Sequence, residues 1–276
     1  MGNQVSFTPY EIKDCLMDVE RTENLKAAIF ATVKSGDVIL EAGGGTGILS
    51  FFALQAGAKH AYIIELSPRF CDVIRDIAAM NGYEDKITVI CGDATCTDIP
   101  IRVDVYISEL LCTGLFNEPQ IQAYNNLRRF TKSTTKYIPT SIESQIKFVE
   151  ADTRKYGLRI DCDSYLAEDI SHTDMTESQT YMTIKFDGKE IKELINYESA
   201  ALLLQPGEVN AAVISTTAML NKTIKAEKTK FLFNPELIFL DIYKIIDNTN
   251  NLYEPMDFQI NYNCGCDTKD IDINVW

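Results

Sequence analysis

Several features that define other classes of protein are missing from this sequence. No apolar run reaches the roughly 18 residues that would span a bilayer. Residues 1–6 lack the basic start and the apolar core of a secretory signal. They do match the short pattern for N-myristoylation, but no basic residues follow to support an anchor, and we take the match as chance. We therefore expect a cytoplasmic protein with no membrane partner.

Positive charge is also scarce. The 276 residues include 26 Lys and Arg against 40 Asp and Glu, which gives a formal net charge of −14. Nucleic-acid binding normally needs a basic face, so we expect no nucleic-acid partner. An acidic chain suits a cationic substrate, although many proteins are acidic for solubility alone.

Spacings that bind structural zinc are absent as well. The eight cysteines form no CxxC pair, and Cys264-Gly265-Cys266 is too closely spaced and has no second pair. Several cysteines fall in predicted strands or helices, where cysteine packs as a small hydrophobic residue. We therefore expect no metal site and a reducing, cytosolic setting.

One stretch organises the rest of the chain. An apolar run from Val38 leads to the acid Glu41, and glycines follow at 43, 45 and 47 before a helical pattern begins. This order predicts a buried strand, a tight turn and the start of a helix. Glycine lets a ligand approach the backbone closely, and the helix N-terminus offers unpaired N–H groups. A plain glycine turn is the alternative, so the remainder of a nucleotide site must follow downstream.

Acidic residues end three later apolar runs. Glu65 lies about twenty residues past the glycine loop, where an acid can accept hydrogen bonds from both ribose hydroxyls. Asp93 and Ala94 follow the run at 87–91, and Glu109 follows the run at 103–107. Open α/β sheets bind ligands at the C-terminal ends of their strands, so this series predicts a nucleotide site at one sheet edge.

The glycine spacing decides between cofactors. It is G-x-G-x-G, and Ile48 occupies the place of the third glycine in the nicotinamide fingerprint G-x-G-x-x-G. With Glu41 before the first glycine, the stretch resembles motif I of the class I S-adenosylmethionine (SAM) methyltransferases. The resemblance implies that Glu41, Gly43, Gly45, Gly47 and Glu65 bind the cofactor. In the same pattern Asp93 and Ala94 meet its adenine edge.

Two regions differ in their periodicity. Strand and helix patterns alternate up to residue 138, which predicts a parallel sheet covered by helices on both faces. After Pro139 the sequence becomes rich in strand patterns separated by turns, which predicts a sandwich or barrel. We expect helices at 11–33, 49–56, 70–81 and 119–130, strands at 144–150, 181–186, 209–220, 229–233, 238–246 and 257–262, and turns at 206–207 and 248–251.

These patterns give an α/β fold class and a two-domain organisation. Residues 1–138 are expected to form a Rossmann-like methyltransferase sheet with an N-terminal helical segment. Residues 139–276 are expected to form a smaller β-rich, barrel-like domain that binds the substrate.

The loop after the fourth strand carries the expected chemistry. Glu109 and Glu118 bracket it at the C-terminal edge of the predicted sheet. Two carboxylates can grip a planar guanidinium bidentately and hold its charge away from one nitrogen. That nitrogen could then attack a sulfonium methyl in line, a reaction in which positioning contributes much of the rate. Both glutamates are therefore catalytic candidates, although each alone could be an ordinary loop acid.

The same loop resembles the double-E hairpin, S-E-x8-E, of the protein arginine methyltransferases. Residues 18–22 resemble the D-E-V-R-T segment of that family, which places Arg21 on its cofactor-binding arginine. Residues 43–50 resemble its G-x-G-T-G-I-L-S, and residues 137–139 resemble its link into a β-barrel. The resemblance covers about residues 10–145. It implies SAM as cofactor and methyl transfer to a guanidino nitrogen. Without the resemblance, Arg21 could be an ordinary solvated charge on a helix.

The sequence also departs from that family. Its Thr-His-Trp loop is missing, since the only histidines are His60 and His172 and the only tryptophan is Trp276. Residues 151–180 leave room for only a reduced dimerisation arm, so a homodimer stays open. These losses favour a free arginine-like metabolite or a peptide over a large protein as the cationic acceptor.

Two other functions remain open from the sequence. One is a methyltransferase for another amine, for nucleic acid or for another acceptor. Enzymes that methylate base amino groups commonly carry N-P-P-Y or D-P-P-Y where Ser108-Glu109-Leu110-Leu111 stands here. The other is a catalytically silent SAM-binding module that acts through partners. Intact acids at positions 41, 65, 109 and 118 argue against such decay.

Overall fold

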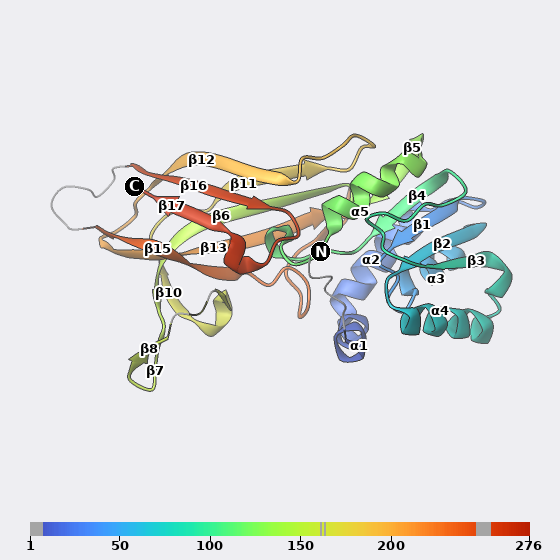
Figure 1. Cartoon of the computed structure of the whole chain (residues 1–276), viewed down its shortest axis with the longest axis horizontal. Coiled ribbons are helices and arrows are strands. Elements are labelled where there is room, and N and C mark those ends of the chain that lie inside the picture. Colours follow the sequence, from blue (N-terminus) through green and yellow to red (C-terminus); the bar gives the residue numbers. More distant parts are fainter. Residues whose placement is uncertain (1–7, 161, 163, 247–254) are drawn as a thin grey trace.

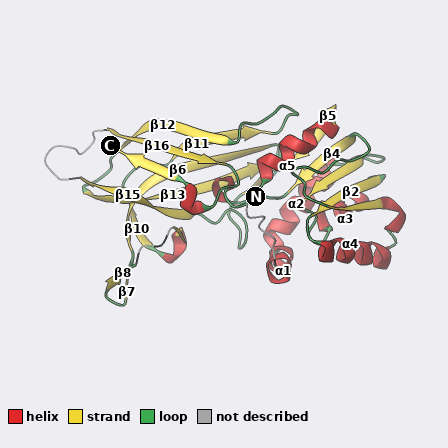
Figure 2. Ribbon diagram, viewed as in Figure 1, coloured by secondary structure: helices red, strands yellow, loops and turns green. Residues whose placement is uncertain are grey.

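The computed structural model describes residues 8–160, 162, 164–246 and 255–276. A helix-covered parallel sheet lies beside a body built almost wholly of antiparallel strands, as Figures 1 and 2 show. This arrangement confirms the predicted fold class. The pattern at residues 1–6 and the turn expected at 248–251 lie outside the described residues.

The parallel sheet has five strands in the order β3-β2-β1-β4-β5. The order reverses between β1 and β4, and open α/β sheets bind their ligands beside such a reversal. The connecting helices α3 and α4 begin and end close to the predicted positions, and the expected 119–130 helix is α5 followed by a 3-10 turn. The strands are β1 (Val38–Ala42), β2 (His60–Glu65), β3 (Ile87–Cys91), β4 (Val103–Ser108) and β5 (Thr131–Ile138), and the helices are α3 (Ile48–Gln55), α4 (Pro68–Asn81) and α5 (Gln120–Leu127).

The segment expected to be helical at 11–33 is helical but broken once. The segment forms two helices, α1 (Pro9–Met17) and α2 (Val19–Thr32), separated at Asp18. Asp18 has a ψ of 89°, outside the helical range, and its side chain accepts a hydrogen bond from the backbone N–H of Arg21. An N-cap aspartate of this kind starts a new helix by satisfying one of its free donors. The break therefore places Arg21 in the first turn of α2.

The antiparallel body is a half-barrel of two sheets that face each other. The rings of Phe148 and Phe258 meet edge to face at 4.9 Å, and the hydroxyls of Tyr181 and Tyr262 lie 2.9 Å apart, so both contacts join one sheet to the other. The first sheet contains β6 (Ser141–Asp152), β9 (Ser164–Leu166), β10 (Ser171–Asp174), β11 (Gln179–Lys185), β13 (Gly207–Met219), β14 (Lys225–Ala226) and β15 (Glu236–Ile246), and the second contains β12 (Leu194–Leu202), β16 (Pro255–Asn263) and β17 (Asp272–Val275).

The strand expected at 229–233 is wrong. These residues form an irregular loop before β15, in which Phe233 has a φ of +54° and the hydroxyl of Thr229 accepts a hydrogen bond from the N–H of Leu232. Alternating apolar residues suggested a strand, but Thr229 and Phe231 bond to Asp18 instead of to a neighbouring strand. The loop is thereby held against the N-terminal helices.

The two regions share a continuous core of buried apolar side chains. Hydrogen bonds also cross between them: the N–H of Gly114 donates to Thr216 on β13, and the hydroxyl of Tyr262 on β16 donates to the carbonyl of Gly114. The chain passes from β5 to β6 at residues 138–141. Whether it divides at 138 and 139 into two folding units remains a prediction.

Two features of the remaining chain bear on the sequence expectations. Cys71 on α4 and Cys91 on β3 form a disulfide, so these two cysteines do not pack as free hydrophobic side chains as expected. Where the structure describes the expected reduced arm, the small hairpin of β7 (Arg154–Lys155) and β8 (Leu158–Arg159) precedes β9. Within the described residues, no helix is long and apolar enough to cross a membrane.

Candidate active site

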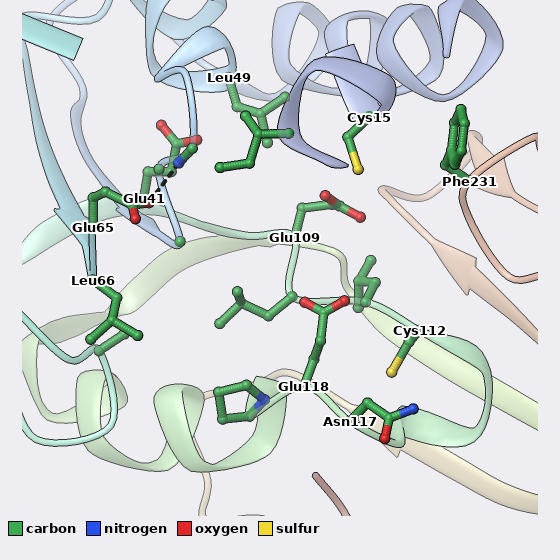
Figure 3. Close-up of a pocket in the computed structure, with 18 of the residues that line it drawn as sticks. Cys15, Glu41, Leu49, Glu65, Leu66, Glu109, Cys112, Asn117, Glu118 and Phe231 are labelled. Carbon is green, nitrogen blue, oxygen red and sulfur yellow. Dashed lines mark hydrogen bonds between the residues drawn. The ribbon is translucent and has the colours of Figure 1, made fainter. Parts of the chain in front are cut away.

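A cavity of about 360 Å³ opens where β1, β2 and β4 end, between the parallel sheet and the half-barrel. Figure 3 shows side chains that converge on it from the glycine loop, the N-terminal helices, the loop after β4 and the half-barrel. The cavity brings together every predicted site residue except Gly47. Gly47 instead caps α3 with a φ of 76°, and a side chain there would press on Ile74 and Phe51.

The glycine loop lies against the cavity. Gly43 has a φ of +77°, and a β-carbon there would meet Leu110 at 2.5 Å, so the loop packs tightly under the segment after β4. Gly45 has a φ of +54°, but a β-carbon on it would touch only Ile12, at 3.8 Å. The space beside Gly45 is therefore open, and a side chain at this position would project into a region suited to a ligand.

Glu65 is fixed at the end of β2. Its side chain is buried; Oε2 accepts from the N–H of Gly45 at 2.7 Å and Oε1 accepts from the N–H of Ser67 at 2.8 Å. Each carboxylate oxygen has a second lone pair, so both can still accept hydrogen bonds from ligand hydroxyls. Asp93 and Ala94 lie in the turn after β3, where Asp93 accepts from Thr95 and the Ala94 carbonyl accepts from Asn126.

Glu41 is 1% exposed at the end of β1. Its Oε2 accepts from the N–H of Ser50 at 3.0 Å, but Oε1 has no partner among the described residues. Burial raises the pKa of Glu41 to about 8, since removal from water penalises the charged form. A buried carboxyl group with a free oxygen at a cavity wall is suited to a positively charged or N–H-bearing ligand group. Together with the open space at Gly45 and the oriented Glu65, it fits SAM.

Arg21 reaches the cavity from the first turn of α2. Its side chain is 10% exposed; one guanidinium nitrogen pairs with Oε2 of Glu109, and the other donates to the carbonyl of Cys15 at 3.0 Å. Burial lowers the pKa of Arg21, although this group stays charged. The alternative of a solvated helix charge is therefore excluded by its position.

Glu109 and Glu118 project into the cavity from the two ends of one loop (Figure 3). The Glu118 carboxylate has neither a hydrogen bond nor an ion pair among the described residues. Burial raises the pKa of Glu118 to about 7, and the positive charge of Arg21 acts in the opposite direction. The pair therefore combines one carboxylate already bound to a guanidinium with one that has no counter-ion in contact.

Contacts from both sides hold this loop. Oε1 of the fully buried Gln120 accepts from the N–H of Leu110 at 3.1 Å, which fixes the start of the loop. The hydroxyl of Thr113 donates to the carbonyl of Asn234 at 2.6 Å in the half-barrel. The N–H of Asn117 donates to the carbonyl of Cys266 in the turn between β16 and β17, at 2.7 Å. The half-barrel thus supports the segment that carries both glutamates.

Three residues of the site were missed by the sequence analysis. Asp18 joins α2 to the half-barrel, Gln120 orients the loop after β4, and Glu236 lines the cavity from the start of β15. Asp18 has a local signal, because an aspartate before a helical pattern marks an N-cap. Gln120 and Glu236 have none, since the role of each depends on which other segment its side chain faces in the fold.

Comparisons with known proteins agree with this geometry. A profile of the family described as "Methyltransferase domain" matches residues 39–134. Protein MJ1452 of Methanocaldococcus jannaschii, which bears the name "uncharacterized", is 30% identical over 262 residues, 94% of each chain. The histone-arginine methyltransferase CARMER of Anopheles gambiae is 34% identical over 130 residues, which cover 46% of this chain but only 21% of that protein.

A solved structure shows the same fold over nearly the whole chain. It is the Trypanosoma brucei PRMT1 enzyme-prozyme heterotetrameric complex with AdoHcy, with a TM-score of 0.73 and 18% identity over 95% of this chain and 91% of that one. The matched domain, the relatives and the shared fold agree with the glycine loop and the acids around the cavity. The chain therefore belongs to the class I SAM-dependent methyltransferases and, within them, resembles the protein arginine methyltransferases.

Proposed function

We propose that the chain methylates a guanidino nitrogen of an arginine-like acceptor, held between Glu109 and Glu118. One observation carries the proposal: both carboxylates enter the same cavity beside the glycine loop, and Glu109 already binds the guanidinium of Arg21. A carboxylate pair recognises a guanidinium through its planar fork of donors. The free carboxylate of Glu118 then has a guanidinium as its natural counter-ion.

The residues around the cavity have separate roles in this proposal. SAM would be held by Glu65, Arg21 and the backbone at Gly45 and would supply an electrophilic methyl group, with S-adenosylhomocysteine as the leaving group and one N–H proton lost from the nitrogen that accepts the methyl. Glu109 and Glu118 bind N–H groups of the acceptor and draw its positive charge toward them, which leaves more electron density on the remaining nitrogen. They also fix the direction in which that nitrogen faces, and alignment of this kind lowers the barrier by restricting motion in advance.

Protonation of Glu118 fits the same role. In the ligand-free protein its pKa of about 7 leaves a large fraction neutral at neutral pH. A bound guanidinium would favour the ionised form and lower that pKa. Acceptor binding near neutral pH should therefore release a proton, and the negative charge would develop only where the substrate's positive charge can neutralise it.

The nature of the acceptor, the assembly and the location of the protein are part of the proposal. The CARMER relatives are named for histone arginine, but their match leaves most of their own length uncovered. The half-barrel offers the loop at 229–234 instead of a Thr-His-Trp motif. We therefore favour a free guanidino compound or a peptide as acceptor. We also propose a homodimer through the reduced arm, which light scattering on the purified protein tests, and a cytoplasmic location.

A direct experiment tests the reaction. The protein is incubated with methyl-labelled SAM and, separately, free arginine, agmatine, arginine peptides and a cell lysate, and the products are identified by mass spectrometry. The proposal expects a product carrying the label on a guanidino nitrogen. Label on an oxygen, a carbon or an aliphatic amine would overturn it, even though the enzyme would remain a methyltransferase.

A further inference from the structure

The cavity continues past the two glutamates to the wall formed by the half-barrel. That wall comprises Leu166, Phe231, Phe233, Asn234 and Glu236. Leu166 and Glu236 are paired across β9 and β15, so regular strand geometry holds both at the edge of the cavity. Phe231 is 38% exposed, and in Figure 3 it lies on the opposite side of Glu109 from Glu41 and Glu65. We call Glu109 and Glu118 the clamp. An elongated molecule bound by the clamp would therefore meet this wall with its far end.

Glu236 gives this wall a negative charge. The residue is partly buried, and burial raises its pKa, with a hydrogen bond to Ser164 acting in the opposite direction. It forms no ion pair among the described residues. Burial raises the pKa of the Cys112 thiol, in the loop after β4, and the charges of Glu118 and Glu236 raise it further, so both carboxylates lie near enough to act on this one group.

Two carboxylates are enough to bind one guanidinium, so Glu236 exceeds what the clamp requires. A carboxylate in a partly dry cavity is unfavourable unless a positive group accompanies it. The lining of the same cavity also includes the apolar side chains of Leu166, Phe231 and Phe233, which suit an alkyl chain. The aromatic surface also attracts cations: Nζ of Lys230 lies 4.9 Å from the centre of the Phe231 ring.

We propose that Glu236 is a specificity-determining residue that binds a second positive group of the acceptor. The preferred acceptor is then a guanidino compound whose alkyl chain carries an ammonium group at its other end. This inference rests on the proposed function, because it takes the guanidinium to be held by Glu109 and Glu118. It goes beyond that function by requiring two positive charges on one substrate.

Isothermal titration calorimetry on the full chain saturated with S-adenosylhomocysteine tests the inference. Agmatine and butylguanidine are the probes, because they share the guanidine and the four-carbon chain and differ in the terminal amine. We expect agmatine to bind wild-type protein about tenfold more tightly or better, the effect of one charge-assisted hydrogen bond. Glu236→Gln should remove this preference and leave butylguanidine affinity within about twofold of wild type.

Matched controls separate recognition from damage to the fold. Glu227→Gln makes the same change in charge at an exposed position that pairs with Lys225, and it should keep the agmatine preference. Unchanged S-adenosylhomocysteine affinity in Glu236→Gln shows that the cofactor end is intact. A peptide with blocked ends that contains Arg and Lys is the third probe; binding tighter than that of agmatine, again lost in Glu236→Gln, would place the second charge on a peptide.

Two results would overturn the inference. Equal affinities of agmatine and butylguanidine for wild-type protein would show that no second charge is recognised. An equal loss of both affinities in Glu236→Gln would show that this residue acts on the clamp generally. Failure of the proposed function is distinguishable, because then neither guanidine would bind wild-type protein at all.

Discussion

The hydroxyl of Thr229 donates a hydrogen bond of 2.6 Å to Oδ2 of Asp18, 211 residues earlier in the chain. The N–H of Phe231 donates to the same oxygen at 2.9 Å, while Oδ1 accepts from the N–H of Arg21. Burial alone would raise the pKa of Asp18, but these hydrogen bonds hold it below its usual value. One buried carboxylate therefore joins the helix that carries Arg21 to the half-barrel wall of the cavity.

Replacing Asp18 with alanine should weaken both stability and cofactor binding. The change removes an N-cap, worth about 0.5–2 kcal/mol, and leaves the Thr229 hydroxyl without its acceptor. Arg21 also loses the cap that sets its orientation, so affinity for S-adenosylhomocysteine should fall. Thermal unfolding and calorimetry measure the two effects. Glu20→Ala, an exposed substitution on the same helix turn, serves as the control; normal cofactor affinity in Asp18→Ala would refute the proposed link to Arg21.

Gly45→Val should abolish cofactor binding. The β-carbon would enter the open space beside the glycine loop, and valine is also strained at a φ of +54°. Gly82→Val controls for that strain, because Gly82 has a φ of +70°, has no atom within 4 Å of its β-carbon position and does not line the cavity. Calorimetry with S-adenosylhomocysteine should show binding lost in the first variant and retained in the second. Equal behaviour of the two would mean that backbone strain, and not the cavity, decides the result.

The parallel sheet and most of the site were predictable because their signals are local. The first four strands each have an acid within two residues of their C-terminal end, and the parallel arrangement brings those ends together without further information. The structure accordingly gathers Glu41, Glu65 and Asp93 around one cavity. The glycine turn also follows from residue type, since positive φ at Gly43 and Gly45 costs glycine little.

The elements that were missed depend on contacts between distant segments. The loop at Thr229–Phe233 is held by hydrogen bonds to Asp18 in a distant part of the chain, whereas periodicity treats each window alone. The strand β12 was missed because only one of its residues, Ala201, is buried, so its alternation of apolar and polar residues is weak. The role proposed for Glu236 depends on its lining the cavity from the start of β15. No sequence pattern around residue 236 indicates that position.

Residues 1–138 alone should be unstable or inactive. Several supports of the loop between Glu109 and Glu118 come from the half-barrel, including the hydrogen bonds from Asn117 to Cys266 and from Thr113 to Asn234. Without them the clamp would lose its geometry, and apolar core surface would be exposed. Limited proteolysis of the full chain should give no early cut near residue 139. A soluble, fully active 1–138 fragment would contradict this dependence.

Acceptor turnover should rise with pH around neutrality. Glu118 must be ionised to bind a cation, and its pKa of about 7 places that change between roughly pH 6 and 8. The kcat/KM for the acceptor should therefore increase through this range and then level off, and Glu118→Gln should flatten the profile.

The pKa values of Glu118 and Glu41 lie above the ordinary 4.5, so their contribution to stability is full below pH 4.5 and is lost as the pH rises through about 7 and 8. The melting temperature of the ligand-free protein should therefore fall across this window. These assignments would be contradicted if it rose instead and if Glu41→Gln left its pH dependence unchanged.

Glu109→Gln and Glu118→Gln test the clamp itself. Each change keeps the shape of the side chain but removes a negative charge that the developing transition state needs, so kcat should fall by roughly 10- to 100-fold. Affinity for S-adenosylhomocysteine should stay near normal in Glu118→Gln, which has no direct contact with Arg21, and should change modestly in Glu109→Gln, which loses an ion pair with it. The double variant should lose less than the sum of the two losses in activation free energy, because both carboxylates bind the same guanidinium. Glu227→Gln controls for the loss of one negative charge, and near-normal turnover by both single variants would show that the clamp mechanism is wrong.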